Sequence, residues 1–129
     1  MRIERVVSDL EGKRSPSALT RQWCRLNQMT EGPVETWKGP TIRSDLFGFA
    51  DHVAFDTRNI CFIQSTSASN RASRVKKVLA NQSAGQLCQM GARILVVTWQ
   101  RKDDKLHYGT VVELDLSDFA EAEQEGERE

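Results

Sequence analysis

The chain has 129 residues, 39% hydrophobic and 28% charged, which is typical of one folded domain with its own core. Its eighteen basic and eighteen acidic residues cancel, which argues against a globally basic nucleic-acid-binding protein, although a strongly acidic end from Asp118 onward leaves the remainder basic. No apolar run approaches the roughly 20 residues that span a bilayer, and the N-terminus lacks the apolar stretch of a signal peptide, so we expect a cytoplasmic protein.

Residues 1–14 carry only a weak structural signal, which is compatible with a short strand over residues 3–7. We therefore expect an N-terminal segment of uncertain structure, an α/β domain over residues 15–116, and an acidic, flexible tail over residues 117–129. The three cysteines, Cys24, Cys61 and Cys88, are odd in number and lack CxxC spacing, so they are expected to be reduced thiols in the core.

The first predicted helix begins at Ser15-Pro16, because serine can cap free backbone amides and proline is tolerated at the first helical position. We expect it to stop near Gly32-Pro33, since proline cannot continue the helical hydrogen bonding. A short strand over residues 34–37 is expected to follow.

A hairpin is predicted next. Residues 49–55 alternate between two faces, with Asp51 on the face of Phe49, and residues 60–66 alternate in the same way, with Gln64 on one face. The polar residues 56–59 form the turn between them.

The second half of the chain predicts an amphipathic helix over residues 70–80, with a basic exposed surface, and a short helix over residues 83–90. The apolar run 94–97 is typical of a central strand buried on both faces, and residues 106–114 alternate as a terminal antiparallel strand. The expected class is α/β, with a mixed β-sheet flanked by helices.

Asp51 is the strongest local anomaly, because it is a carboxylate on a strand face that otherwise carries large apolar side chains. It needs a cation, a hydrogen-bond donor, a metal ion or access to solvent. An aspartate that reaches the surface or pairs with an arginine, and an aspartate that belongs to a functional site, are about equally favoured by the sequence. Gln64 interrupts the apolar face of the neighbouring strand in the same manner. Across a hairpin, the two side chains would approach each other.

These residues carry a resemblance. Arg43-Ser-Asp45-Leu-Phe-Gly48-Phe-Ala-Asp51, followed after a turn by Cys61-Phe-Ile-Gln64-Ser-Thr66, resembles the signature of the PD-(D/E)xK nuclease superfamily, in particular its small Holliday-junction-resolvase-like and virus-type members. The resemblance covers roughly residues 15 to 115. It implies a restriction-endonuclease-like core in which a helix, three strands, a helix and a strand follow in that order.

By this resemblance Asp51 binds a divalent ion, Mg²⁺ or Mn²⁺, together with Gln64 in the acidic position and the backbone carbonyl of Ser65. Thr66 stands where the family usually has a lysine, which is the main departure from the pattern. Lys76 or Lys77 on the following helix can return an ammonium group, or be ordinary solvated charge, and of the two we place Lys77 in the catalytic set. Asp45 either supplies a further ligand or caps a turn.

The expected partner is DNA, branched or duplex, and the resemblance implies a homodimer. Basic residues that can contact phosphates from around the Asp51 end of the sheet are Arg43, Arg71, Arg74, Lys76 and Lys77. His52 lies on the strand face opposite Asp51, and neither it nor His107 has the spacing of a zinc site.

Three hypotheses follow from the sequence. The first is a metal-dependent phosphodiesterase acting on DNA at Asp51 and Gln64. The second is a catalytically degenerate nucleic-acid-binding module of the same fold, because Gln64 and Thr66 are uncharged. The third, weaker hypothesis is a protein-interaction domain in which Asp51 merely pairs with Arg43.

Overall fold

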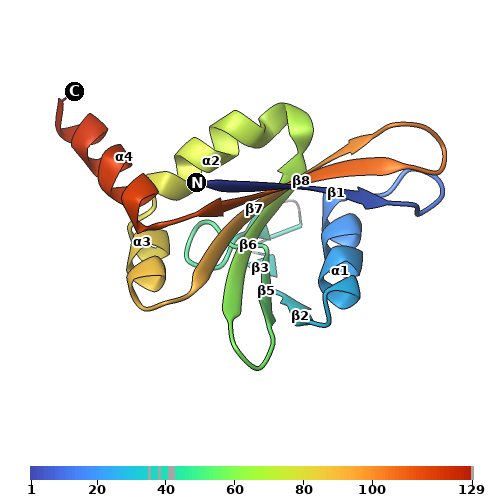
Figure 1. Ribbon diagram of the computed structural model, residues 1–129, viewed down its shortest axis with the longest axis horizontal. Coiled ribbons are helices and arrows are strands. Elements are labelled where there is room, and N and C mark those ends of the chain that lie inside the picture. The colour runs from blue at the N-terminus through green and yellow to red at the C-terminus, as the bar shows by residue number, and fades with distance from the viewer. Residues whose placement is uncertain (35, 38, 41–42, 129) are drawn as a thin grey trace.

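The computed structural model describes residues 1–34, 36–37, 39–40 and 43–128, and shows a mixed α/β fold (Figure 1). In chain order the elements are β1 (Arg2–Ser8), α1 (Pro16–Leu26), β2 (Thr30–Pro33), β3 (Thr36–Trp37), β4 (Arg43–Ser44), β5 (His52–Phe55), β6 (Ile60–Ser67), the short 3-10 turn η1 (Ala68–Asn70), α2 (Arg71–Leu79), α3 (Gln82–Gln89), β7 (Arg93–Arg101), β8 (His107–Leu114) and α4 (Leu116–Arg128).

A six-stranded sheet forms the centre, with the strand order β1-β8-β7-β6-β5-β2. β6 and β7 run parallel, whereas the other neighbouring strands of this sheet run antiparallel. The predicted mixed sheet flanked by helices is therefore confirmed. β3 and β4 form a separate two-stranded sheet.

Helices cover the sheet on both faces (Figure 1). We call the face that carries Phe62, Gln64 and Val96 the α2 face, because α2, α3 and Phe119 of α4 pack against its apolar residues. The opposite face carries Ile63 and is covered by α1, so we call it the α1 face. Strand alternation sends successive side chains to these two cores.

The parallel strands and their neighbours agree with the sequence. β7 lies between β6 and β8, and Ile94, Leu95, Val96 and Val97 are all buried, as expected for a central strand.

Asn81 caps α3 by accepting from the backbone N–H of Ala84. Among the described residues no helix is long and apolar enough to cross a membrane.

The first helix is shorter than predicted. α1 ends at Leu26, where the Asn27 side chain donates to the backbone oxygen of Trp23, and Gln28 adopts a positive φ of 59°. The expected stop at Gly32-Pro33 is therefore wrong, because residues Thr30–Pro33 form β2 and pair with β5.

The predicted strand over residues 49–55 is also too long. Leu46 to Ala50 form a tight turn closed by the backbone of those two residues, with Gly48 at a φ of 82°. Phe49 and Ala50 are both fully buried in the same apolar cluster, so strict alternation begins only after the turn. As a consequence Asp51 sits immediately before β5 rather than in the middle of a strand.

The two ends of the chain are more ordered than the sequence indicated. Residues Arg2–Ser8 form a complete edge strand paired with β8. The segment expected to be a flexible acidic tail contains α4, whose start is capped by Asp115: this carboxylate accepts from Ser117 and from the backbone of Asp118. Phe119 anchors α4 on the apolar cluster of the α2 face.

Candidate functional site

The two polar residues singled out by the sequence are in direct contact. Gln64 Nε2 donates to Asp51 Oδ2 over 2.6 Å, and the backbone N–H of Ser65 donates to the same oxygen over 2.8 Å. The ladder places them together, because His52 pairs with Ile63 and the backbone N–H of Asp51 donates to the oxygen of Ile63. The expectation that the hairpin brings these side chains together is confirmed.

This contact is buried. Asp51 and Gln64 are 5% and 3% exposed. Gln64 donates through its nitrogen, while its Oε1 has no hydrogen-bond partner among the described residues. A buried amide oxygen without a partner costs about 1–3 kcal/mol, so this oxygen is the atom of the pair that a ligand would satisfy.

Ser65 presents its side chain to the other face. Its hydroxyl lies 2.8 Å from the hydroxyl of Thr20 on α1, and the indole N–H of Trp99 donates to Thr20 over 3.0 Å. These three groups form a polar chain inside the α1-face core. They fix β6 against α1 behind the Asp51 contact.

Thr66 begins a row of threonines across the sheet. Thr66 pairs in register with Thr98, and Thr98 with Thr110, so three hydroxyls lie side by side on the α2 face. Asn70 Nδ2 lies 3.4 Å from Thr66 Oγ1. Arg71, at the start of α2, donates to the hydroxyls of Thr98 and Thr110.

Two other predicted site residues meet each other. Lys77 Nζ lies 3.6 Å from Asp45 Oδ2, which joins α2 to the segment before the tight turn. The lysine side chain is 44% exposed and the aspartate side chain 19%. The structure thus provides each with a partner of opposite charge, and a pair this exposed contributes little stability.

The remaining predicted phosphate contacts are spread along α2. Arg71 and Arg74 are half-buried, and Lys76 is exposed. The side chain of Arg43 lies outside the part of the chain whose side chains are described, so the proposed pairing of Asp51 with Arg43 stays a prediction. In the described ranges no group of three or more histidine, cysteine, aspartate or glutamate side chains is placed to hold a metal ion.

A partly buried network of charged and polar side chains on the α1 face was not anticipated from the sequence. His52 Nδ1 lies 2.6 Å from Glu31 Oε2, and Arg21 Nε donates to Glu31 Oε1 over 3.2 Å. The side chains of His52 and Glu31 are 2% and 5% exposed. As predicted, His52 faces away from Asp51. The network joins α1, β2 and β5 and is best explained as structural.

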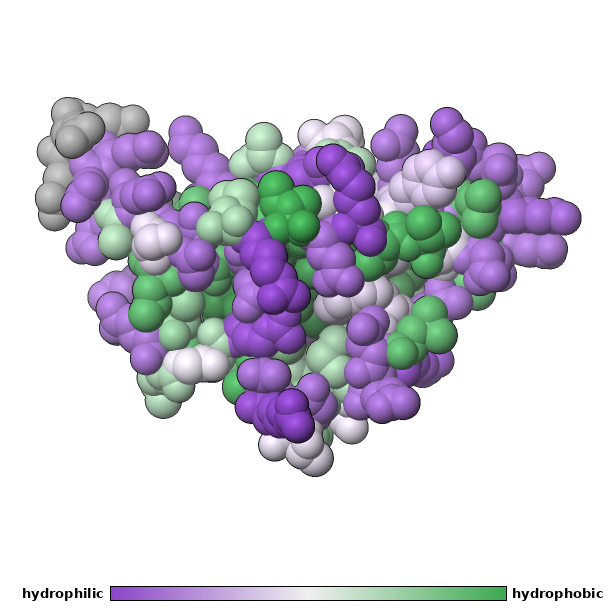
Figure 2. Space-filling model, in the orientation of Figure 1, coloured by the Kyte–Doolittle hydropathy of each residue, from purple (hydrophilic) through white to green (hydrophobic). Residues whose placement is uncertain are grey.

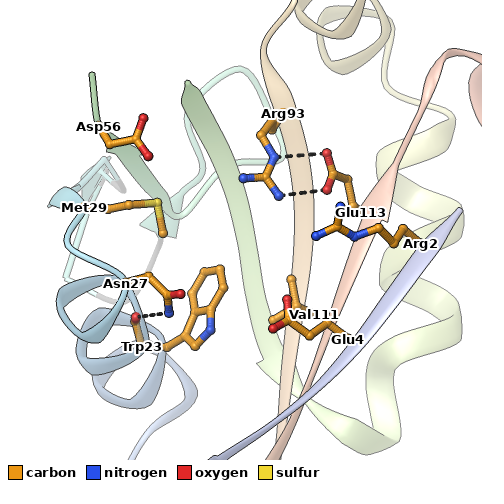
Figure 3. A pocket seen from close by; sticks show the side chains of 9 residues that line it. All are labelled: Arg2, Glu4, Trp23, Asn27, Met29, Asp56, Arg93, Val111 and Glu113. Carbon is orange, nitrogen blue, oxygen red and sulfur yellow. Dashed lines mark hydrogen bonds and ion pairs between the residues drawn. The ribbon is translucent and has the colours of Figure 1, made fainter. Parts of the chain in front are cut away.

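A cavity of about 290 Å³ opens on the α1 face, between α1 and strands β1, β7 and β8 (Figure 3). The pair Arg93–Glu113, with two hydrogen bonds of 3.0 and 2.8 Å, forms one wall, and Trp23 another. This bond lowers the pKa of the Glu113 carboxyl, chiefly because Arg93 donates to it. The cavity contains none of the predicted site residues.

The cysteines are free thiols, as predicted. Burial raises the pKa of Cys24 to about 12 and also raises the pKa of Cys61 and Cys88. Thiols with raised pKa values are poor nucleophiles, so these three residues belong to the packing of the core.

The chain matches no protein-family model, no curated protein and no solved structure. The class that its own fold and geometry define is a mixed α/β domain with a buried carboxylate and amide pair where β5 begins beside β6.

Proposed function

We propose that this chain is a metal-dependent phosphodiesterase that acts on DNA, with its site at Asp51 and Gln64. The proposal depends on one observation above all: a buried carboxylate contacts a buried amide whose own oxygen lacks a partner among the described residues. Buried oxygen atoms of this kind are the ligands that hard divalent cations prefer.

The order of the elements supports the proposal. Leaving out the short β3 and β4 between β2 and β5, the turn η1 between β6 and α2, and α3 between α2 and β7, the elements from α1 to β7 are a helix, three strands, a helix and a strand, with β6 parallel to β7. This is the order that the resemblance to PD-(D/E)xK nucleases implies. In it, Asp51 precedes the second of the three strands and Gln64 lies on the third.

The donor set fits Mg²⁺ or Mn²⁺. The carboxylate of Asp51, Oε1 of Gln64 and the backbone carbonyl of Ser65 would hold the ion. When bound, such an ion lowers the pKa of a coordinated water and stabilises negative charge on a phosphate. The protein's own residues fix the position of the carboxylate, because Asp51 Oδ2 accepts from both Gln64 Nε2 and the Ser65 amide.

A second candidate is a nucleic-acid-binding module of the same fold without catalysis. It is favoured by the absence of a lysine at position 66, where nucleases of the resembling family usually have one. Thr66 has no ammonium group, and the ammonium of Lys77 lies against Asp45. Without a cation near the reacting phosphate, both water activation and charge stabilisation are weaker.

One experiment distinguishes the two candidates. Cleavage of branched, nicked and linear DNA is measured during a Mn²⁺ titration, together with the thermal shift, for wild type and Asp51→Asn. Asparagine keeps an oxygen for the Ser65 amide while removing the charge, and Asp9→Asn, on the exposed residue after β1, is the matched control.

If the protein is a phosphodiesterase, we expect wild type and Asp9→Asn to cleave in the presence of Mn²⁺ and Asp51→Asn not to cleave. The circular dichroism spectra of both variants should equal that of wild type. If neither wild type nor control cleaves any of these substrates while Mn²⁺ still stabilises the protein, the binding module is the correct alternative. Cleavage that survives in Asp51→Asn contradicts a site at Asp51.

A further inference from the structure

A second polar site lies on the α2 face, away from Asp51, where β1 and β8 extend beyond the helices. A cavity of about 370 Å³ opens there, and its lining includes Arg5, Arg71, Tyr108 and Thr110. In Figure 1, β1 and the β7–β8 hairpin project away from α2, and the space-filling view of Figure 2 shows hydrophobic side chains interspersed with hydrophilic ones rather than a single apolar area.

Arg71 is held in place by hydroxyl groups rather than by an acid. Its Nε donates to Thr98 Oγ1 over 3.1 Å and its Nη2 donates to Thr110 Oγ1 over 3.0 Å, and the side chain is half-buried. Among the ion pairs formed by the described residues, none involves Arg71. A rigid guanidinium that still has N–H groups to donate is a preorganised anion donor.

Arg5 supplies a second guanidinium to the same cavity. It pairs in register with Thr110, so strand alternation places it on the α2 face next to the residue that Arg71 contacts. Its neighbour Glu4 points to the α1 face, where it lines the other cavity. Both cations line the cavity, and none of the described residues that line it is acidic, which raises the local positive potential.

An aromatic ring completes the site. Tyr108 pairs with Val7, and both line the cavity with 45% and 61% of their surface exposed. An exposed tyrosine next to two guanidinium groups offers stacking area for a base and contacts for the phosphate that follows it. Duplex DNA, in which the bases are already stacked, cannot use the ring in this way.

We infer that this cavity binds a single-stranded segment of nucleic acid, with a phosphate at Arg5 and Arg71 and an unpaired base against Tyr108. The identity of the ligand as nucleic acid rests on the proposed function. The threonine row links the two places: Thr66 lies two residues after Gln64, and Thr98 and Thr110 continue from it to Arg71.

The test is fluorescence anisotropy of a labelled oligothymidine and of a duplex of the same length, in EDTA, so that no cleavage is required. We expect tighter binding of the single strand. Tyr108→Ala should weaken it by about ten-fold, whereas Tyr108→Phe keeps the ring and the affinity. Arg5→Gln should reduce the slope of log K against log salt by about 0.7, the amount for one phosphate contact on a single strand.

Arg58→Gln is the matched control, because this exposed arginine lies in the turn before β6, at the opposite end of that strand from Arg71. It should leave both the affinity and the salt slope unchanged. Equal or tighter binding of the duplex overturns the inference, as does an equal loss of affinity in Arg58→Gln and Arg5→Gln. Binding of oligothymidine that Tyr108→Ala leaves unchanged also overturns it.

The outcome is separable from that of the proposed function. If Asp51→Asn cleaves like wild type, the proposed phosphodiesterase site fails, but the binding measured in EDTA still decides the role of the Arg5–Arg71 cavity. If cleavage depends on Asp51 while Arg5→Gln and Tyr108→Ala bind normally, the catalytic proposal stands and this inference fails.

Discussion

The carboxylate of Asp51 and the side-chain amide of Gln64 share a hydrogen bond of 2.6 Å between residues thirteen positions apart. The bond needs a neutral donor at position 64. Gln64→Glu replaces that donor with a second carboxylate, and two like charges in a buried site are unfavourable.

We therefore expect Gln64→Glu to lower the melting temperature in EDTA by several degrees and to respond more strongly than wild type to Mn²⁺, because an ion would neutralise the pair. Gln64→Met, which keeps the length of the side chain but neither polar group, is the control and should show no response to Mn²⁺. Differential scanning fluorimetry measures both effects. A Gln64→Glu variant that is destabilised but insensitive to Mn²⁺ would argue against an ion at this position.

Gly109 allows β8 to lie against an indole ring. A Cβ at this position would lie 2.6 Å from Cζ3 of Trp99 and 2.8 Å from Cγ2 of Val6. Both distances are too short for a contact between carbon atoms. We expect Gly109→Ala to lower the free energy of unfolding by about 1–3 kcal/mol through overpacking. Urea denaturation provides the measurement. Gly32→Ala, in a strand position with open space around the new Cβ, should be close to neutral.

The hydroxyl of Thr20 connects Trp99 to Ser65 inside the α1-face core. Thr20→Val conserves the shape but leaves the buried indole N–H without an acceptor, so we expect a loss of about 1–3 kcal/mol in the free energy of unfolding. Thr20→Ser keeps the hydroxyl and should recover most of the hydrogen-bond contribution. Equal stability of the valine and serine variants would show that the bond is not needed.

The Arg93–Glu113 pair gives stability a dependence on pH. Arg93 lowers the pKa of Glu113 in the folded state, so the contribution is present above the unfolded pKa of about 4.3 and is lost as the pH falls through the lowered folded value. The two side chains are still 31% and 24% exposed, and the solvent screening that remains limits the effect to below about 1 kcal/mol.

Arg93→Met should therefore be less stable than wild type in urea at pH 7, and this difference should shrink toward pH 3. Lys105→Met, in the exposed β7–β8 turn, serves as the control for removing a positive charge. A difference between wild type and Arg93→Met that stays constant across this range would assign the pair's contribution to packing of the arginine stem instead.

The sequence predicted the contact between Asp51 and Gln64 because a hairpin with alternating faces leaves few registers open. The sequence misplaced the start of β5. The order Phe49, Ala50, Asp51 looks like the alternation of a strand, whereas the structure places Phe49 and Ala50 in a turn and buries both of them. The alternation of apolar and polar residues indicates which strands pair, but it does not indicate the residue at which a turn ends and a strand begins.

Features that depend on distant partners were harder to predict. The network of Arg21, Glu31 and His52 joins three separate elements, so no single periodic pattern contains it. The helix α4 was missed for a different reason: the acidic composition of its surface hid the cap at Asp115 and the one anchoring ring of Phe119. Capping and a single apolar contact carry little weight in a compositional argument.

The pairing of β1 with β8 has a consequence for how the protein is made. Arg2 lies opposite Glu113, and Ser8 opposite His107, so the strand of this sheet that is synthesised first waits for the one that is synthesised last before its backbone is paired. Closing a chain segment of that length is entropically costly, and sheets built on such distant pairs form slowly. Until then β1 is an unpaired strand with exposed Ile3 and Val7, which makes the interval before completion of β8 the stage most vulnerable to aggregation.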